Sequence, residues 1–435
     1  MGLGGGTFLT QNKVLPGSYI NFTSAAKASA TLSDRGYCAM ALELDWGVDG
    51  EIFTVEVADF QADSLKIFGY DYTSDKLKGL RDLFLNATTL YAYRLNSGVK
   101  ASNAYATALY SGIRGNDIKI VIAVNADDET KFDVTTMIDS TVVDTQTVSG
   151  ATALKANDFV IFKSDATLAA TAGTALTGGT NAASVTGTEY QAFLDKLEAY
   201  SFNTLGCLST EETIKSLYAA YTSRLRDDMG IKFQTVLYNK AADYEGVINL
   251  KNAVTDSGAI ASSLVYWLTG VECGCAVNKS LTNKLYNGEY TINTSFKQSE
   301  LETALKAGEL VFHKVGNDVR VLDDVNSFVS VTTDKTEDFR SNQVMRVLDQ
   351  IGNDIAVLFN TRYLGKVQNN DSGRISFWNE LVTYNKQLEQ IGAIENFSSD
   401  DLKVEQGTSK NSVAVTNPVT PVVAMTKLYM TVIVE

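Results

Sequence analysis

Proline is scarce in this chain of 435 residues. Average usage near 5% would give about twenty prolines, but only Pro16, Pro418 and Pro421 are present. Because proline removes a backbone donor and favours extended backbone, it is tolerated in connecting arms and excluded from interior elements. The three positions therefore predict a continuous folded body between two extended terminal arms, residues 1–24 and 398–435.

Histidine is nearly absent, and this limits catalytic chemistry. The one histidine, His313, alternates with apolar residues in a predicted strand, and no Gly-x-Ser-x-Gly motif supplies a nucleophile. Cys273 and Cys275 lack the second ligand pair that zinc requires. We interpret His313 as a packing residue and the two cysteines as buried or turn thiols. The sequence predicts no catalytic, cofactor-binding or metal-binding residues.

Calcium loops, basic clusters and long apolar runs are missing too. The adjacent carboxylates Asp127-Asp128 and Asp323-Asp324 lack the ligand spacing of a calcium loop, so we interpret both pairs as solvated turns. The formal charge is −14 and Lys and Arg are dispersed, which argues against direct nucleic-acid binding. No eighteen apolar residues run together, which argues against membrane insertion. Four scattered cysteines and an N-terminus unlike a signal peptide predict a protein made in the cytoplasm.

Helix and strand patterns divide the body into parts. Residues 25–97 read as the first part of an α/β body, and residues 179–333 as its continuation, with predicted strands alternating with helices. Between them, residues 98–178 carry short period-two strands at 118–125, 131–138 and 142–148, which predict an inserted, β-sandwich-like antiparallel domain. The predicted fold class is thus an α/β body of mixed sheet and flanking helices, with an inserted antiparallel β domain and extended terminal arms.

Capping boxes mark the expected helix starts in the continued body. The pairs are Thr188 with Gln191, Ser209 with Glu212, and Ser299 with Glu302. A hairpin is expected over residues 309–322, turning near Gly316.

Residues 334–397 predict two amphipathic helices. A capping box of Asp334 and Glu337 is expected to start the first. Apolar residues at spacings of three and four predict one buried stripe on each helix, and Gly392 suits the position after the second helix. The stripes are listed in chain order: Val344, Leu348, Ile351, Ile355 and Leu358, then Phe377, Leu381, Tyr384, Leu388 and Ile391.

The last segment is rich in strand formers. Strand-like runs occupy residues 402–406 and 412–416, and residues 427–435 alternate in period two. Leu428, Met430, Val432 and Val434 share one face, with Tyr429 on the other. An apolar strand at a chain end needs a partner, so we expect this one to pair with another sheet edge.

Several segments resemble the contractile tail sheath family of bacteriophages, in the form common in phages and phage-like particles of Gram-positive bacteria. Residues 15–20 (Leu-Pro-Gly-Ser-Tyr-Ile) resemble the family's Pro-Gly-x-Tyr opening. Residues 110–118 resemble its Gly-x-x-Gly-Asn entry into the inserted domain, and residues 176–180 its Gly-Gly return. The match in residues 326–370 is similar in order and spacing to the family's C-terminal domain.

This resemblance implies a structural subunit that stacks in six-membered rings around an inner tail tube and contracts to drive the tube through the bacterial envelope. It implies partners in the tube, baseplate and tail terminator proteins, and a place in the virion tail after assembly in the host cytoplasm. Neighbouring subunits would be linked by donated arms that complete a small sheet. The implied arm contacts are Phe8, Leu9, Tyr19, Ile20, Val413, Val415, Leu428, Tyr429, Met430, Val432 and Val434.

Three other interpretations are considered, and one of them, a secreted or surface-layer protein, is disfavoured because the N-terminus does not resemble a signal peptide. The sheath of a phage-tail-like bacteriocin would carry the same features. An α/β enzyme belongs to a different class, and turnover lost on changing His313 or Cys273 would identify it.

Overall fold

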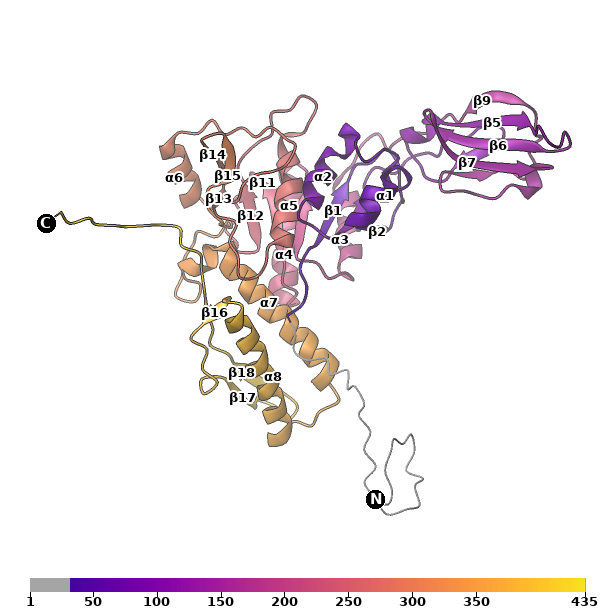
Figure 1. The fold of residues 1–435 in the computed structure, drawn as a ribbon. Coiled ribbons are helices and arrows are strands. Elements are labelled where there is room, and N and C mark those ends of the chain that lie inside the picture. Colours follow the sequence, from indigo (N-terminus) through magenta and orange to yellow (C-terminus); the bar gives the residue numbers. More distant parts are fainter. Residues whose placement is uncertain (1–31, 435) are drawn as a thin grey trace, which may run out of the picture.

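The computed structural model describes residues 32–434, and the structural statements below concern those residues. Phe8, Leu9, Tyr19 and Ile20 lie outside them. Figure 1 shows a central α/β body, a β domain on one side of it, and a pair of long helices, α7 and α8, on another. The last residues run away from the body as an extended tail.

A seven-stranded mixed sheet forms the centre of the body, in the order β13-β12-β11-β10-β1-β3-β2. Neighbours are parallel except β2, which runs antiparallel to β3. The strands are β1 (Tyr37–Leu42), β2 (Ile52–Glu56), β3 (Thr89–Arg94), β10 (Thr204–Cys207), β11 (Gln234–Tyr238), β12 (Val247–Leu250) and β13 (Glu309–Leu310). The predicted mixed sheet is confirmed.

Helices cover both faces of this sheet. Because successive residues of β1 point to opposite faces, this strand contributes side chains to the apolar core on each side. Cys38, Met40 and Leu42 pack with α1, α2 and α5, whereas Ala39 and Ala41 pack with α3 and α4. The helices are α1 (Val57–Phe68), α2 (Lys78–Phe84), α3 (Gly187–Leu197), α4 (Glu212–Ser223) and α5 (Leu264–Gly274), with α6 (Gln298–Lys306) near the sheet edge.

The inserted domain is an antiparallel β unit, as predicted. Its sheet has the order β7-β6-β5-β9, and a second pair joins β4 to β8. Alternate residues Ile118, Ile120 and Ile122 of β5 are buried in its core. The strands are β4 (Ala106–Ala108), β5 (Ile118–Val124), β6 (Phe132–Ile138), β7 (Thr141–Val148), β8 (Val160–Phe162) and β9 (Thr171–Ala175).

Helices α7 (Asn342–Leu358) and α8 (Asp371–Gln390) each carry a buried apolar stripe and are joined by a turn that includes Phe359–Tyr363. Two members of the predicted stripes do not fit: Leu348 is only half-buried, and Ile391 lies just after the last residue of α8 and is 38% exposed. Val347, Phe377, Leu381, Tyr384 and Leu388 are buried together. Gly392 follows α8 with a φ of 71°, as its position predicted. The expected start of the first helix is wrong: residues Glu337–Arg340 form a 3-10 turn, and Ser341 caps α7 by accepting the amide of Val344.

The three predicted capping boxes are also displaced. Helix α3 uses Thr186 and Glu189, the same pattern two residues earlier. Ser209 accepts the amide of Glu211, but Glu212 is already the first helical residue of α4. Helix α6 starts at Gln298, where Glu300 accepts the amide of Lys297. Each segment offers several polar residues able to cap a helix, and the packing of the apolar stripe decides which of them stands at the end.

Small strand pairs complete the structure. β14 (Phe312–Val315) and β15 (Asp318–Val321) form the predicted hairpin, with Gly316 at a φ of 62°. Near the C-terminus, β17 (Lys403–Gln406) pairs with β18 (Val413–Thr416), and β16 (Ile394–Glu395) with β19 (Thr420–Pro421). These pairs account for both strand-like runs of the last segment.

Candidate functional site

The C-terminal tail is extended and lies away from its own body (Figure 1). Val422 donates its amide to Ala393 O (3.0 Å), and Ala424 donates to Gln343 Oε1 on α7 (3.0 Å). After Ala424 no hydrogen bond joins the tail to the rest of residues 32–434. Its large apolar side chains are 72–101% exposed, and they are Met425, Leu428, Tyr429, Met430, Val432, Ile433 and Val434. The tail is therefore an apolar strand former without a partner in the described chain.

The hairpin of β17 and β18 offers open sheet edges. Within residues 32–434 each of its two strands pairs only with the other, so one edge of each strand retains free backbone donors and acceptors. Val413 contacts the apolar cluster of α7 and α8, whereas Val415 is 40% exposed. The predicted arm residues Val413 and Val415 are thus held on the body, and the predicted tail residues lie apart from them.

A pocket of about 300 Å³ lies beside this hairpin, between the turn that follows α7 and the start of α8. Phe359, Tyr363, Phe377 and Val413 give it an apolar floor, and Asn369 and Lys410 add polar groups. Such a pocket next to an open strand edge fits the requirements of strand addition, in which backbone bonds supply affinity and side-chain pockets supply specificity.

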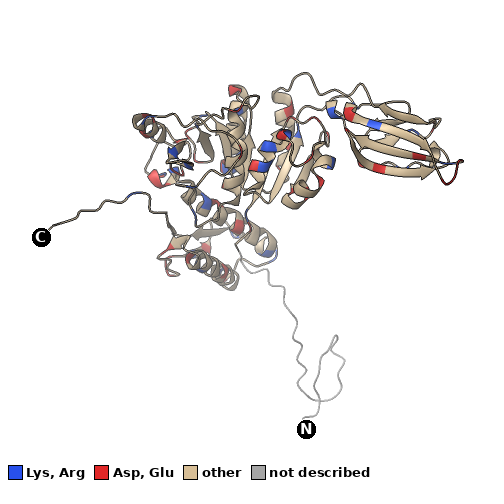
Figure 2. Ribbon diagram, turned by 45° about the horizontal axis from the view of Figure 1, so that its top comes forward, with Lys and Arg blue, Asp and Glu red and all other residues tan. Residues whose placement is uncertain are grey.

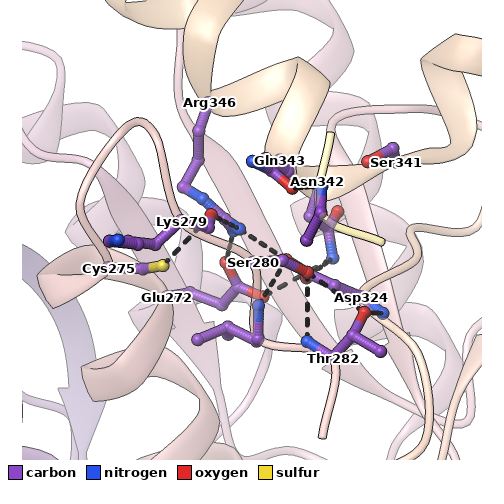
Figure 3. A network of polar contacts seen from close by, with 12 residues as sticks. Glu272, Cys275, Lys279, Ser280, Thr282, Asp324, Ser341, Asn342, Gln343 and Arg346 are labelled. Atoms are coloured by element: carbon purple, nitrogen blue, oxygen red, sulfur yellow. Dashed lines mark hydrogen bonds and ion pairs between the residues drawn. The ribbon is translucent and has the colours of Figure 1, made fainter. Parts of the chain in front are cut away.

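The tail begins next to helix α7, and buried charged residues attach this helix to the body. Arg346, on α7 and 1% exposed, donates to Glu272 Oε2 on α5 at 2.6 Å and pairs with Asp324 Oδ2 (Figure 3). Asn342 Nδ2 donates to Asp324 Oδ1 at 3.0 Å, and Leu281 N donates to Asp324 Oδ2 at 2.9 Å. We call Glu272, Asp324, Asn342 and Arg346 the ionic junction, because they join α7 to the body.

Burial and the neighbouring Asp324 carboxylate raise the pKa of Glu272 to about 8. Burial lowers the pKa of Arg346, but the charges of Asp324, Cys275 and Glu272 and the hydrogen bond to Asp324 together outweigh it, so the pKa is raised and Arg346 remains a cation. The junction therefore holds one guanidinium between two buried carboxylates, and the pKa of one of them, Glu272, is raised. A second pair on the same helix, Asp349 with Arg226 (2.6 and 2.8 Å), is also buried.

The interpretation of Asp323-Asp324 as a solvated turn is wrong, since Asp324 is only 3% exposed. Its burial is possible because Arg346, Asn342 and the Leu281 amide satisfy its oxygens. Asp127-Asp128 does lie in a surface turn, where Asp128 accepts from Thr130. Sequence reasoning missed the ionic junction, and the available signal was the presence of Asn342, Gln343 and Arg346 among the apolar residues at the start of α7.

The residues considered for catalysis or metal binding lie in buried or partly buried positions. His313 lies in β14, and partial burial lowers its pKa. Cys38, Cys207, Cys273 and Cys275 are free and buried, and burial raises the pKa of Cys207 to about 12. Residues 32–434 contain no group of three or more His, Cys, Asp or Glu side chains arranged to hold a metal ion. No helix in that part of the chain is long and apolar enough to cross a membrane. Acidic and basic residues are interspersed over the body (Figure 2).

Family models match four successive parts of the chain. Residues 35–95 match the tail sheath protein Gp18 domain III N-terminal region, and residues 96–181 match the phage tail sheath protein beta-sandwich domain. Residues 183–327 match the phage tail sheath protein central domain, and residues 334–435 match the phage tail sheath C-terminal domain.

Whole-chain relatives agree with these matches. The phage-like element PBSX protein XkdK of Bacillus subtilis is 32% identical over 99% of this chain and 99% of its own. The crystal structure of a sheath tail protein from Desulfitobacterium hafniense is 38% identical, covers 93% of this chain and 96% of its own, and has a TM-score of 0.83. The helical sheath of the anti-feeding prophage in its contracted state shares the fold at 13% identity, with coverages of 96% and 99% and a TM-score of 0.57.

The matched parts follow one another in the order of the chain and include the mixed sheet, the β insertion, the paired helices and the tail. The family consists of structural components of phage and phage-like tails, which agrees with the tail and open strand edges as the outstanding features of the surface. The chain belongs to the phage tail sheath family.

Proposed function

We propose that this protein is the structural subunit of a contractile tail sheath. It polymerises as stacked six-membered rings around an inner tail tube, and its contraction drives the tube through the bacterial envelope. The supporting observation is the exposed apolar tail, which has no partner in the described chain and belongs to a protein of the sheath family. Its partners are further copies of itself, the tube protein, and the baseplate and terminator proteins, in a tail assembled in the host cytoplasm.

The tail docks on a neighbouring copy, in this proposal. Leu428, Met430, Val432 and Val434 face the neighbour, each contributing about 1.5–3 kcal/mol when fully buried. Ordering the strand costs roughly 1–2 kcal/mol per residue, so the backbone hydrogen bonds to an open edge are needed as well. Head-to-tail donation of this kind does not close on itself and generates a filament. The N-terminal arm, with Phe8, Leu9, Tyr19 and Ile20, is proposed to join the same shared sheet as Val413 and Val415.

A matched pair of substitutions tests the docking. Val432→Asp places an unpaired carboxylate on the docking face, whereas Thr431→Asp places the same charge on the other face. We expect Val432→Asp to abolish assembly into tubes by electron microscopy and to leave the melting temperature of the isolated subunit unchanged, because Val432 is already 72% exposed. If the isolated subunit melts lower by as much as assembly is impaired, the tail packs on its own body and the proposal fails.

Residues 98–178 are proposed to form a peripheral domain that the body does not need for folding. Val99 and Thr180 exchange backbone hydrogen bonds (2.9 and 3.1 Å), so the chain leaves and re-enters the body at one place. Joining Ser97 directly to Gly179 should leave a folded body with a modestly lower melting temperature, because Trp46 packs against this domain and loses its cover. An unfolded product by circular dichroism would show that the boundary is wrong.

The sheath of a phage-tail-like bacteriocin is the second candidate, since a whole-chain relative belongs to a phage-like element. The two differ in what the tail delivers. Particles that carry the protein and contain DNA in an attached head indicate a phage, whereas headless particles that kill cells indicate a bacteriocin.

A further inference from the structure

A small polar cavity lies beside the ionic junction, on the body side of α7. It measures about 20 Å³, and a cavity needs about 10–15 Å³ by the same measure to hold one water-sized occupant. Arg35 and Asn203 line it from the region just before β1 and β10, and Lys232 from the segment just before β11. Arg346 and Asp349 line it from α7. The cavity therefore sits between the amino-terminal edge of the central sheet and the helix that anchors the tail.

Two of the residues that line this cavity, Asn203 and Arg346, each carry one donor without a hydrogen-bond partner among residues 32–434. Asn203 Oδ1 accepts the amides of Gly36 and Tyr37 (both 3.1 Å), which fixes the orientation of the side-chain amide. Its Nδ2 donor has no hydrogen-bond partner among residues 32–434. Arg346 is buried and its Nε also has no partner in that part of the chain. A buried donor without an acceptor costs free energy, so an occupant that accepts hydrogen bonds is favoured here.

The charges around the cavity favour an anion as that occupant. Arg346 is paired with Glu272 and Asp324, and Asp349 takes both of its hydrogen bonds from Arg226. Arg35 and Lys232 form no ion pair within residues 32–434. Arg35 donates to the backbone oxygens of Cys275 and Glu272, and Lys232 Nζ donates to Arg226 O. Carboxylates lie near both side chains, but neither of these two positive charges is directly paired with one in that part of the chain.

The pKa directions agree with this geometry. Burial, together with nearby Arg346, lowers the pKa of Arg35. Burial, together with nearby Arg226, lowers the pKa of Lys232. The surroundings of both side chains therefore disfavour their charged forms. A bound anion would stabilise those charged forms.

We propose that this cavity binds one small monovalent anion of the halide class, which links Asn203, Lys232 and Arg346 and so fastens α7 to the central sheet. The size of the cavity excludes polyatomic anions as large as phosphate. The carboxylate of Asp349 also lines the cavity, but it accepts its hydrogen bonds from Arg226. The unpaired donors therefore remain available to the anion.

Bromide is the probe, because it replaces chloride and scatters anomalously. Crystals of the full chain grown in sodium bromide should show an anomalous peak in the cavity. In solution, the melting temperature should rise by roughly 1–2 °C for each tenfold increase in bromide once the site starts to fill, relative to sodium gluconate at equal ionic strength. Water without an anomalous peak would overturn the proposal.

Asn203→Asp provides the sharpest variant. The aspartate retains an oxygen for the amides of Gly36 and Tyr37 but replaces the free donor by a negative oxygen, so the bromide dependence of melting should disappear. Asn370→Asp makes the same charge change at the cap of α8, where Asn370 accepts the amide of Gly373, and should keep the dependence. An Asn203→Asp protein with the wild-type bromide response contradicts the proposal. If that variant does not fold, the anomalous map of the wild-type protein still decides.

Discussion

Helix α7 is held on two sides by different interactions. Toward α8 it packs through apolar side chains, with Val347 and Leu358 against Phe377 and Leu381. Toward the body it is held by charged and amide groups, chiefly the ionic junction and the pair of Asp349 with Arg226. Apolar packing is non-directional, whereas a buried ion pair requires fixed geometry and is costly to break. The comparison leads us to expect that the polar side sets the orientation of α7 and that the apolar side adds stability.

The largest effect is expected from Arg346→Met. The substitution leaves Asp324 buried without its cation, and breaking a buried pair in this way costs about 3–5 kcal/mol. Urea denaturation of the unassembled subunit measures the loss. A loss below about 1 kcal/mol would mean that the carboxylates simply take up protons, and the ionic side would then be weaker than we infer.

On the apolar side, Leu381→Ala should cost about 2–5 kcal/mol, because Leu381 is fully buried and truncation leaves a cavity. Unlike Arg346→Met, it should not alter the dependence of stability on pH between 5 and 8. Denaturation curves at both ends of that range distinguish the two sides. Equal pH profiles for both variants would contradict the comparison.

The pH dependence itself provides the third test. The pKa of Glu272 is raised from 4.5 to about 8 in the folded protein, so the folded state holds this proton more tightly than the unfolded state. The resulting stabilisation is fully present below about pH 4.5 and is lost as the pH rises through about 8. We expect the free energy of unfolding to fall by on the order of 1–3 kcal/mol between pH 5 and 8.

Glu272→Gln should flatten this profile, because the glutamine does not titrate. Glu302→Gln makes the same change of charge at an exposed position of α6 and should keep the wild-type profile. A Glu272→Gln protein whose stability still declines over this range would assign the dependence to another group.

The smallest effect is expected from Arg362→Met. Arg362 pairs with Glu380 across the apolar side of α7, but both side chains are partly exposed. Such pairs contribute about 0–1 kcal/mol, so the same kind of substitution as Arg346→Met should have little effect here. A cost as large as that of Arg346→Met would show that burial is not what distinguishes the two sides.

The two sides of α7 also differ in how far the sequence reveals them. The apolar side follows from spacing, because Phe377, Leu381, Tyr384 and Leu388 recur at intervals of three and four. The ionic side does not, since Glu272 and Asp324 lie 74 and 22 residues from Arg346. A buried aspartate and an aspartate in a turn cannot be distinguished by sequence until their partners are known, so the sequence alone predicts a turn position for Asp324.

The body shows the same limit. Helix α5 has apolar residues on all sides because it is buried almost throughout, so it lacks the polar face by which a helix is recognised. The tail, in contrast, is predicted as a period-two strand from the alternation of its residues, and within residues 32–434 it has no strand partner. The spacing of residues predicts the buried face of a single helix or strand. It does not predict the contacts that depend on which helices and strands pack together.

The hydrogen bond from Ala424 to Gln343 has a mechanical consequence. It is the last attachment of the tail to its own body within the described chain. Residues 425–434 follow it in the described part of the chain, and a fully extended segment of that length spans roughly 33–36 Å. An extended strand can swing about its attachment but cannot lengthen. If the tail joins two subunits, as we propose, they can rotate relative to one another, but their separation has an upper limit. A larger movement would have to detach the tail at one of its ends.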